Sequence, residues 1–486
     1  MAVSPASSST EQSVLVVGGG IAGLLSARML ARKGFKVTVV EGRAHLGGAV
    51  GSHQLAGMVL DAGAESFATR STVVSDLLQE LGLKDKIVLP NSLGSWLYLP
   101  TGAKPSPSTG LMGIPGSFDD PALKATLSAS GIARARMDKF LPASVGAKAK
   151  TLGELVRARM GQQVLDNLVA PVVSGVHSVH PDKLDVDVVT PGLKDAMLRL
   201  GSLAAAAGSI RKAAPAGSAV AGIEGGMNQL SEALVQDLQR MHVRIMTGFN
   251  VIAVDRDPVT GEWTLIQRRS DVGARPIAIS APNLVMATDG PTAVRILGSH
   301  LPAHAVPSIK AGPEIALVSL VVDKPELDRA PRGTGLLISD QVTNVRAKAL
   351  THASAKWQWV ADKLGEGRHV VRLSYGRSSD ANSPLSEVAL HDDQLITLAL
   401  HDASKLLGTN ISPKQLVDAD VVRWQGAMPA PKAGHKEKIV AFRQSLDQLE
   451  GVCAVGAWLS GTGLVAVTKD THAVIEAYAD ELLNHH

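Results

Sequence analysis

The chain has 486 residues, a formal net charge of +3 at pH 7 and 45% hydrophobic residues, so it can bury a large core and should form two or three domains. It has no arginine-rich run and only 3% aromatic residues, so we expect no nucleic-acid partner. The single cysteine, Cys453, excludes an internal disulfide and a cysteine-rich metal cluster, and it fits a reducing compartment.

The first 12 residues are polar, so we expect a disordered leader at 1–12 and no secretory signal. No stretch of about 18 uninterrupted apolar residues occurs, so we expect no transmembrane helix. The apolar run 315–322, IALVSLVV, has the length of a strand. We therefore predict a cytoplasmic protein, and the sequence leaves open a peripheral contact with a membrane.

Residues 14–41, VLVVGGGIAGLLSARMLARKGFKVTVVE, predict a strand, a glycine-rich turn, a helix and a second strand. In such a turn the first glycine permits the bend, the second lets a pyrophosphate approach the backbone, and the third lets the helix pack closely. The helix N-terminus then faces the phosphates. Glu41 lies near the roughly 20-residue spacing of an acid that binds ribose hydroxyls and repels a 2′-phosphate. This pattern favours NAD or FAD over NADP, and its predicted contacts are Gly18, Gly19, Gly20, Ile21, Ala22, Gly23 and Glu41.

Two features after the second strand favour FAD over NAD. Arg43 and the pair Gly47-Gly48 follow Glu41 and resemble two-domain flavoproteins of the amine oxidase superfamily. In that superfamily, backbone amides of the glycine pair approach the flavin side of the pyrophosphate. Residues 61–67, DAGAESF, resemble the segment that covers the isoalloxazine ring. The resemblance implies further cofactor contacts at Gly42, Arg43, Gly47, Gly48, Ala49, Gly63, Ala64, Glu65 and Ser66.

Nearly the whole chain resembles the oxygen-dependent, FAD-containing porphyrinogen oxidases of bacterial haem synthesis. The resemblance rests on seven segments in the family's order: AGAESFATR (62–70), TLGELVRARMGQQVLDNLVAPVVSGVHSVHPDKL (151–184), GIEGGMNQLSEAL (222–234), ALTHASAKW (349–357), VRLSYGR (371–377), RWQGAMPAPKAGH (423–435) and VGAWLSGTGLVAV (455–467). Three positions depart from the family: Ala430-Pro431 stands for Gln-Tyr, Val465 to Val467 alter the closing motif, and His177 stands for a tyrosine. They leave open the flavin edge and the substrate pocket.

The resemblance implies an α/β fold with a discontinuous, Rossmann-like FAD domain, an antiparallel-sheet substrate domain and a helical insertion. The expected FAD domain comprises 13–94, 211–298 and 441–486, the insertion 95–210, and the substrate domain 299–440. We expect 243–257 to form a strand pair and the closing helix to point its N-terminus at the flavin, where it would stabilise negative charge. The remaining implied cofactor contacts are Val251, Trp424, Gly456, Ala457, Thr462, Gly463 and Leu464.

The implied reaction is the six-electron oxidation of coproporphyrinogen III to coproporphyrin III by FAD and dioxygen, with hydrogen peroxide as by-product. Protoporphyrinogen IX is expected as a second substrate. The flavin carries the redox chemistry, so we name no catalytic acid or base and no metal. Arg70 is expected to meet a propionate, and His177 the macrocycle. The sequence also leaves open a monomer or homodimer and hand-over to the next haem-pathway enzyme.

Three alternatives remain. A flavin amine oxidase would place a lysine on the strand near residue 315, but no lysine occurs between Glu314 and Val322. A carotenoid-desaturase-like flavoprotein shares the cofactor motifs but does not explain the Trp424 to His435 segment. The departures at Ala430-Pro431 and Val465 to Val467 also keep open a non-catalytic protein that binds FAD.

Overall fold

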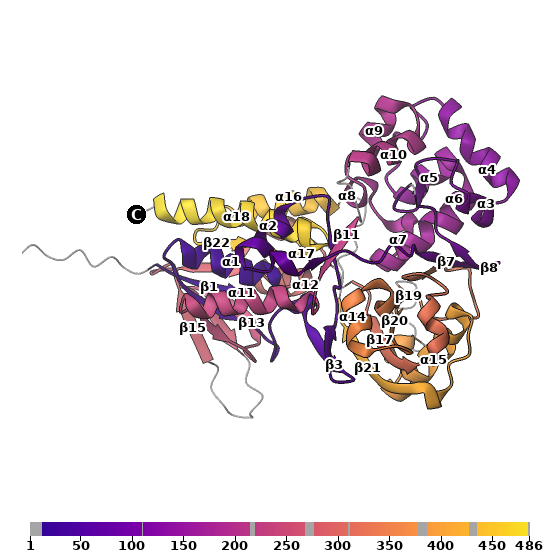
Figure 1. The fold of residues 1–486 in the computed structure, drawn as a ribbon. Helices are drawn as coiled ribbons and strands as arrows, with labels where there is room; N and C mark the ends of the chain where they lie inside the picture. The colour runs from indigo at the N-terminus through magenta and orange to yellow at the C-terminus, as the bar shows by residue number, and fades with distance from the viewer. Residues whose placement is uncertain are drawn as a thin grey trace, which may run out of the picture.

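The computed structural model describes residues 12–108, 110–213, 219–267, 277–309, 312–377, 386–426 and 435–484. Figure 1 shows three units: a parallel-sheet unit that holds both the earliest and the latest parts of the chain, a helical unit, and an antiparallel-sheet unit below the helical one. The departure at Ala430-Pro431 lies outside the described residues.

The parallel sheet has five strands in the order β12-β2-β1-β16-β22. Its strands come from three distant parts of the chain, which confirms the α/β class with a discontinuous cofactor unit. Both faces are covered, because residues of β1 alternate between two separate buried cores. The strands are β1 (Ser13–Val17), β2 (Lys36–Val40), β12 (Arg244–Met246), β16 (Asn283–Met286) and β22 (Val452–Ala454).

Helices cover both faces of this sheet. One face packs against α1, α2, α11 and α18, and the other against α12, α16 and a small antiparallel sheet. The bounds are α1 (Ile21–Arg32), α2 (Val73–Glu80), α11 (Asn228–Arg240), α12 (Gly290–Leu297), α16 (His435–Leu446), α17 (Ala457–Ser460) and α18 (Leu464–Asn484), with β13 (Val251–Arg256), β14 (Trp263–Gln267) and β15 (Ile277–Ala281).

We predicted that residues 243–257 form a strand pair, and the predicted pairing is wrong. β12 and β13 both form, but β12 pairs in parallel with β2, and β13 pairs with β14 in the small antiparallel sheet. The reason is the intervening turn: Gly248 adopts a φ of +69°, and the amide of Phe249 donates to the carbonyl of Glu41 (2.9 Å). The chain is thus tied to the end of β2 before β13 begins.

The helical unit encloses its own core of aliphatic side chains. Its helix α5 begins with a capping box, in which Thr151 and Glu154 satisfy each other's backbone amides. A fully buried ion pair, Arg159 Nε to Asp138 Oδ1 (2.6 Å), ties helix α5 to the preceding turn. The helices are α3 (Ala122–Thr126), α4 (Ala129–Arg136), α5 (Leu152–Met160), α6 (Gln162–Val164), α7 (Ala170–His177), α8 (Val186–Val189), α9 (Leu193–Leu200) and α10 (Leu203–Ala213).

The third unit is a seven-stranded sheet in the order β21-β17-β20-β19-β18-β7-β8. Helix α15 covers one face, and α13, α14 and the β3–β4 hairpin pack near the other. The bounds are β7 (Trp96–Leu99), β8 (Gly102–Pro105), β17 (Ile315–Asp323), β18 (Gly335–Ile338), β19 (Ala349–His352), β20 (Arg368–Tyr375), β21 (Leu416–Trp424), β3 (Ser52–Leu55), β4 (Met58–Asp61), α13 (Ala353–Lys356), α14 (Gln358–Leu364) and α15 (Asp392–Leu407).

Strands β7 and β8 lie in the range that we expected to be a helical insertion. They instead add two strands to the edge of the seven-stranded sheet. β7 joins that sheet by pairing with β18 over Trp96 to Tyr98, and this one pair is parallel. The short strands β5 (Phe67–Ala68), β11 (Val220–Ile223) and β6 (Ile87–Val88) form a separate three-stranded sheet, and β9 (Gly110–Leu111) pairs with β10 (Ile114–Pro115).

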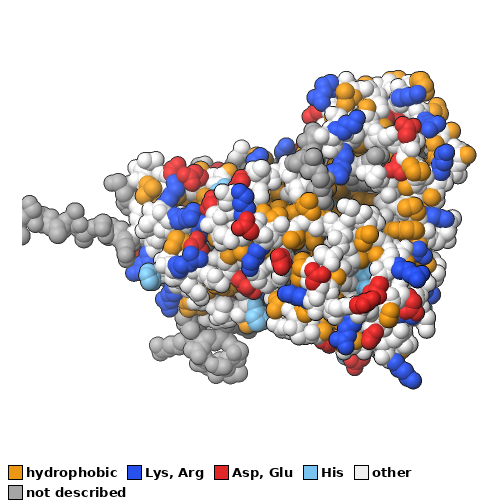
Figure 2. All heavy atoms as spheres, viewed as in Figure 1, with side chains coloured by type: hydrophobic (Ala, Val, Ile, Leu, Met, Phe, Trp, Pro, Cys, Tyr) orange, Lys and Arg blue, Asp and Glu red, His pale blue; other side chains and the backbone are white. Residues whose placement is uncertain are grey.

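The visible face carries Lys and Arg side chains interspersed with Asp and Glu over all three units (Figure 2). In the described ranges, no helix combines the length and apolar character that crossing a bilayer demands.

Candidate cofactor and substrate site

The predicted cofactor residues converge at the carboxyl ends of the parallel strands, where open α/β sheets bind ligands. Gly18 follows β1, Glu41 follows β2 and Gly456 follows β22. Gly18 has a φ of +113°, and a Cβ there would lie 2.6 Å from the carbonyl oxygen of Ala287, just after β16. Only glycine therefore lets these strand ends approach so closely.

The turn before α1 has the geometry of a phosphate cradle. A Cβ on Gly23 would overlap the carbonyl oxygen of Gly18, so this glycine is needed for α1 to pack on the turn. At Gly20, by contrast, a Cβ would meet no atom within 4 Å. Helix α1, which begins with Ile21 and Ala22, has no side-chain cap at Gly20 and no acidic residue in its first turn. Its amino end can thus accept a pyrophosphate.

Glu41 is fixed beside this turn. Its Oε2 accepts from the amide of Gly19 (2.7 Å) and its Oε1 from the amide of Arg43 (2.8 Å). A carboxylate offers about four acceptor positions, so ribose hydroxyls can still bind. A Cβ on Gly42 would lie 3.6 Å from Asn250, which precedes the buried Val251. Val251 therefore lies close to the Glu41 segment, although its contact with adenine stays a prediction.

The second glycine pair closes the cradle from the other side. The amide of Gly47 donates to the carbonyl of Gly19 (2.8 Å), and a Cβ on Gly48 would lie 3.2 Å from Cα of Gly20. Both Gly47 and Gly48 have positive φ, at +99° and +56°. The two glycine-rich turns thus line one space, and this arrangement fits the pyrophosphate of FAD.

The segment expected to cover the flavin touches the antiparallel sheet through Trp424. The amide of Ala64 donates to the carbonyl of Ala49 (2.9 Å), and a Cβ on Gly63 would lie 3.3 Å from the Trp424 ring. The indole of Trp424 donates to the carbonyl of Ala62 (2.8 Å), while the guanidinium of Arg43 lies 5.3 Å from the ring centroid. The cofactor segment and the end of β21 are therefore in direct contact.

Glu65 joins the same two units by charge. It forms ion pairs with Lys356 and with Arg372 (2.8 Å), and Arg372 also donates to the carbonyls of Asp61 (3.1 Å) and Gly63 (3.2 Å). Burial opposes ionisation of Glu65, but the two cations outweigh it and lower its pKa to about 2. Glu65 therefore stays ionised near neutral pH. Ser66 follows directly and is half-buried.

Asp61, in the same segment, has a perturbed pKa that we did not predict. It accepts the amide of Asn228 at the start of α11 (3.2 Å), beside the left-handed Gly226. Burial raises its pKa to about 6, and the adjacent backbone amides moderate the rise. The DAGAESF motif contains Asp61, but the raised pKa of Asp61 depends on its burial by a segment that comes much later in the chain.

The closing motif supplies a second helix start. Gly456 has a φ of +131° and precedes Ala457, the first residue of α17. Gly463 has a φ of +101°, and neither Gly461 nor Gly463 would bring a Cβ within 4 Å of another atom. Helix α18 starts at Leu464, directly after Thr462 and Gly463, and packs against α1. Its open amino end lies in the same unit as the cradle. Of the departures here, Val465 and Val467 are buried in the core shared with α1.

The two predicted substrate residues lie on different units. Arg70 is exposed just after β5, and His177 is the buried last residue of α7. Burial lowers the pKa of His177 to about 4, and its Nδ1 has no hydrogen-bond partner. Among the residues that the structure describes, no hydrogen bond or ion pair joins Arg70 to His177. Sequence reasoning missed Lys356 and Arg372, although both lie inside the ALTHASAKW and VRLSYGR segments.

The chain matches a family model and curated proteins over nearly its whole length. The model for flavin containing amine oxidoreductases matches residues 21–466. A Bacillus subtilis protein named coproporphyrinogen III oxidase is 27% identical over 464 residues, covering 93% of this chain and 94% of that protein. A Mycobacterium tuberculosis protein of the same name is 30% identical over 486 residues, covering 96% and 98%.

Solved structures share the fold. A putative protoporphyrinogen oxidase from Exiguobacterium has a TM-score of 0.82 at 23% identity and covers 97% of this chain. A putrescine oxidase variant has a TM-score of 0.65 at 14% identity and covers 98%. The glycine cradle, Glu41 and the open helix start fit FAD, and the family match agrees. The chain therefore belongs to the flavin-containing amine oxidoreductase family and is an FAD-dependent oxidoreductase.

Proposed function

We propose that the enzyme oxidises coproporphyrinogen III to coproporphyrin III in haem biosynthesis, with dioxygen as the final oxidant and hydrogen peroxide as by-product, and that it also accepts protoporphyrinogen IX. The observation that carries this proposal is the similarity, near full length, to coproporphyrinogen III oxidases of several bacterial genera. A chloroplastic/mitochondrial protoporphyrinogen oxidase of Arabidopsis thaliana, 22% identical over 470 residues, supports the second substrate.

Bound FAD would supply the two-electron acceptor for each of the successive oxidations. The protein would supply orientation and charge. Glu65 stays ionised, and with Arg372 and Lys356 it would hold the cofactor segment against the antiparallel sheet. We propose that Arg70 binds a propionate and that the neutral His177 faces the macrocycle.

We place the reaction in the cytoplasm, with the product handed to the next enzyme of haem synthesis. What supports this location is the lack, in the described part of the chain, of a helix suited to cross a membrane. Peripheral membrane contact and a monomeric or dimeric state remain part of the hypothesis. Salt and carbonate washing of membranes would test the location, since resistance to both would contradict it.

Turnover on coproporphyrinogen III tests the proposed function. In air, we expect the growth of coproporphyrin fluorescence and one peroxide for each pair of electrons removed. Putrescine and benzylamine serve as comparison substrates for the second candidate, an amine oxidase, which the family match and the putrescine oxidase fold support. Amine oxidation without porphyrinogen oxidation would reverse the assignment.

A further inference from the structure

A buried lysine lies between the helical unit and the antiparallel sheet. The side chain of Lys348, just before β19, donates to the hydroxyl of Ser178 and to the carbonyl of Gly376 (2.9 Å). The residue is only 2% exposed. Neither of these two partners is negatively charged, and a buried ammonium without a counter-ion is costly. Burial and the nearby charge of Arg377 accordingly lower the pKa of Lys348 to about 7.

The backbone around Lys348 holds its two partners in unusual conformations. Ser178 has a φ of +57°, which few residues other than glycine adopt. Gly376 has a φ of +91°, and a Cβ there would overlap the carbonyl oxygen of Glu314.

A second unmatched group lies next to Ser178. His177 is 8% exposed, and its Nδ1 has no hydrogen-bond partner. A carboxylate bound here would accept hydrogen bonds from the ammonium of Lys348 and from Nδ1–H of His177. To reach the ammonium it would displace the Ser178 hydroxyl, which exchanges a hydrogen bond to a neutral acceptor for an ion pair with a charged one.

The position lies at the end of the sheet where β21 also ends. Lys348 directly precedes Ala349 of β19, which pairs with Ser374 of β20. The next two strands in the sheet are β17 and β21, and Trp424 at the end of β21 pairs with Ile315 of β17. Lys348 and Trp424 thus lie at the same end of the sheet, separated by three strand spacings or roughly 14 Å. Trp424 contacts the segment expected to cover the flavin, so Lys348 lies at the same end of the sheet as that contact.

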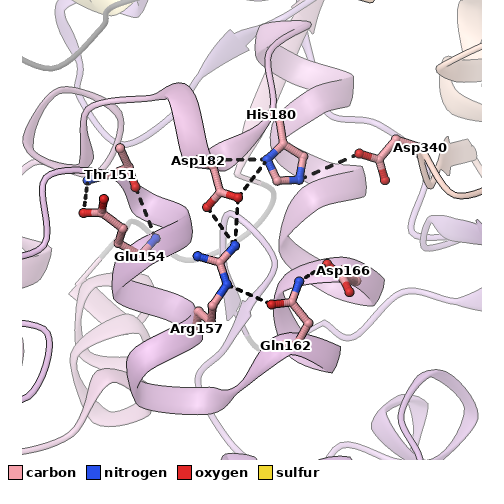
Figure 3. A network of polar contacts seen from close by, with 8 residues as sticks. All are labelled: Thr151, Glu154, Arg157, Gln162, Asp166, His180, Asp182 and Asp340. Carbon is pink, nitrogen blue, oxygen red and sulfur yellow. Dashed lines mark hydrogen bonds and ion pairs between the residues drawn. The ribbon is translucent and has the colours of Figure 1, made fainter. Parts of the chain in front are cut away.

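A polar network fixes the loop beyond Ser178 (Figure 3). Asp182 accepts from Arg157 (2.8 Å), and His180 lies between Asp182 (3.5 Å) and Asp340 (3.7 Å), which follows β18. Gln162 and Asp166 extend the network from Arg157. The end of α7 is thereby held against the same sheet that carries Lys348.

We propose that Lys348, with His177, forms a carboxylate-binding subsite for one propionate of the porphyrinogen. This inference rests on the proposed function. It assigns Lys348 a role in substrate affinity that is separate from the role proposed for Arg70, which follows β5.

Substitution of Lys348 tests the subsite. Lys348→Met keeps the volume and removes the charge, and Lys348→Gln keeps polar contacts without charge. Both should raise KM for coproporphyrinogen III about tenfold or more while kcat changes little, because a charged hydrogen bond is lost far from the reacting carbon. The matched control is Lys324→Met, because Lys324 is also buried but pairs with Glu326 (2.9 Å) away from this site.

Binding of the stable product separates charge from structure. Tryptophan quenching should show that Lys348→Met weakens coproporphyrin III about tenfold but leaves its tetramethyl ester unchanged. Equal KM values for wild type and Lys348→Met, or equal losses for acid and ester, would overturn the subsite while porphyrinogen oxidation stands. If wild type oxidises no porphyrinogen, the proposed function and the subsite both fall.

Discussion

Glu65 and Arg372 form an ion pair of 2.8 Å between the cofactor unit and the antiparallel sheet. The carboxylate also pairs with Lys356, and all three side chains are largely buried. Removing one partner of a buried ion pair leaves the remaining buried charges without a counter-ion. The contact therefore couples the position of segment 61–67 to that of the sheet.

Glu65→Gln should destabilise the protein by about 3 kcal/mol and weaken FAD retention, because two cations lose their counter-ion. Urea unfolding followed by flavin fluorescence measures both effects. Glu476→Gln is the control, since Glu476 pairs with Lys33 (2.8 Å) at the surface and should cost less than about 1 kcal/mol. Equal costs for the two variants would contradict a structural role for Glu65.

Gly20→Ala and Gly23→Ala should separate cofactor binding from folding. Gly20 has an ordinary φ of −76° and open space around its Cβ position, so the alanine variant should fold but lose FAD affinity. Gly23→Ala should fail to fold normally, because its Cβ would overlap the carbonyl oxygen of Gly18. Circular dichroism and flavin content check this. Full FAD occupancy in Gly20→Ala would place the pyrophosphate elsewhere.

Purified protein should carry FAD rather than NAD, and Glu41→Ala should weaken its retention. Hydrogen bonds to a charged group contribute about 1.5–3 kcal/mol, which corresponds to roughly 10- to 150-fold in affinity. Glu41→Gln, which keeps an acceptor for Gly19 or Arg43, should lose less. Release of NAD without flavin on denaturation would disprove the cofactor assignment.

Arg70→Ala should raise KM for coproporphyrinogen III more than it lowers kcat, because propionates are remote from the reacting carbon. Arg32→Ala is a matched control, since Arg32 is exposed on α1 and pairs only with Glu80 (3.1 Å) among the described residues. Steady-state kinetics on both variants decide the matter. Unchanged affinity in Arg70→Ala would remove Arg70 from the substrate site.

A buried histidine pair should make stability depend on pH. His352 Nε2 lies 3.0 Å from His369 Nδ1. Burial, with the neighbouring His369, lowers the pKa of His352 to about 3, and burial also lowers that of His369. The unfolded state therefore binds more protons as pH falls below the ordinary value of 6.5. Stability is fully present above that pH and is lost toward pH 3, by at most about 1.4 kcal/mol per pH unit for each histidine.

His352→Phe should flatten this dependence between pH 6.5 and about 4, where Asp61 acts in the opposite sense. The raised pKa of Asp61 contributes stability below its ordinary value of 3.8 that is lost as pH rises through about 6. The difference in unfolding free energy between wild type and His352→Phe removes the Asp61 contribution, because both proteins contain Asp61. Parallel curves of unfolding free energy against pH would show that His352 is not the source.

Local rules predict only part of the cofactor cradle. The glycines at 18, 20 and 23 and Glu41 follow from spacing and backbone geometry within one short segment, whereas the Gly47-Gly48 pair was indicated by resemblance to flavoproteins of the amine oxidase superfamily. The pairing of β12 and β13 was predicted wrongly, because alternation indicates strands but not their partners. Lys356, Arg372 and Lys348 were missed for a similar reason: their partners Glu65 and Ser178 lie far away in sequence, and only tertiary packing brings them together.

The late position of β22 and α18 has a consequence for biosynthesis. Helix α18 packs against α1, and β22 completes the parallel sheet beside β16. While the ribosome is still making the segment between α1 and β22, the glycine cradle exists without helix α18, which covers its unit. Contacts of such wide sequence separation form slowly, and incomplete chains expose apolar surface. A nascent chain should thus capture flavin only after β22 and α18 leave the exit tunnel, so a translation arrest before Val452 would release protein that cannot hold the cofactor.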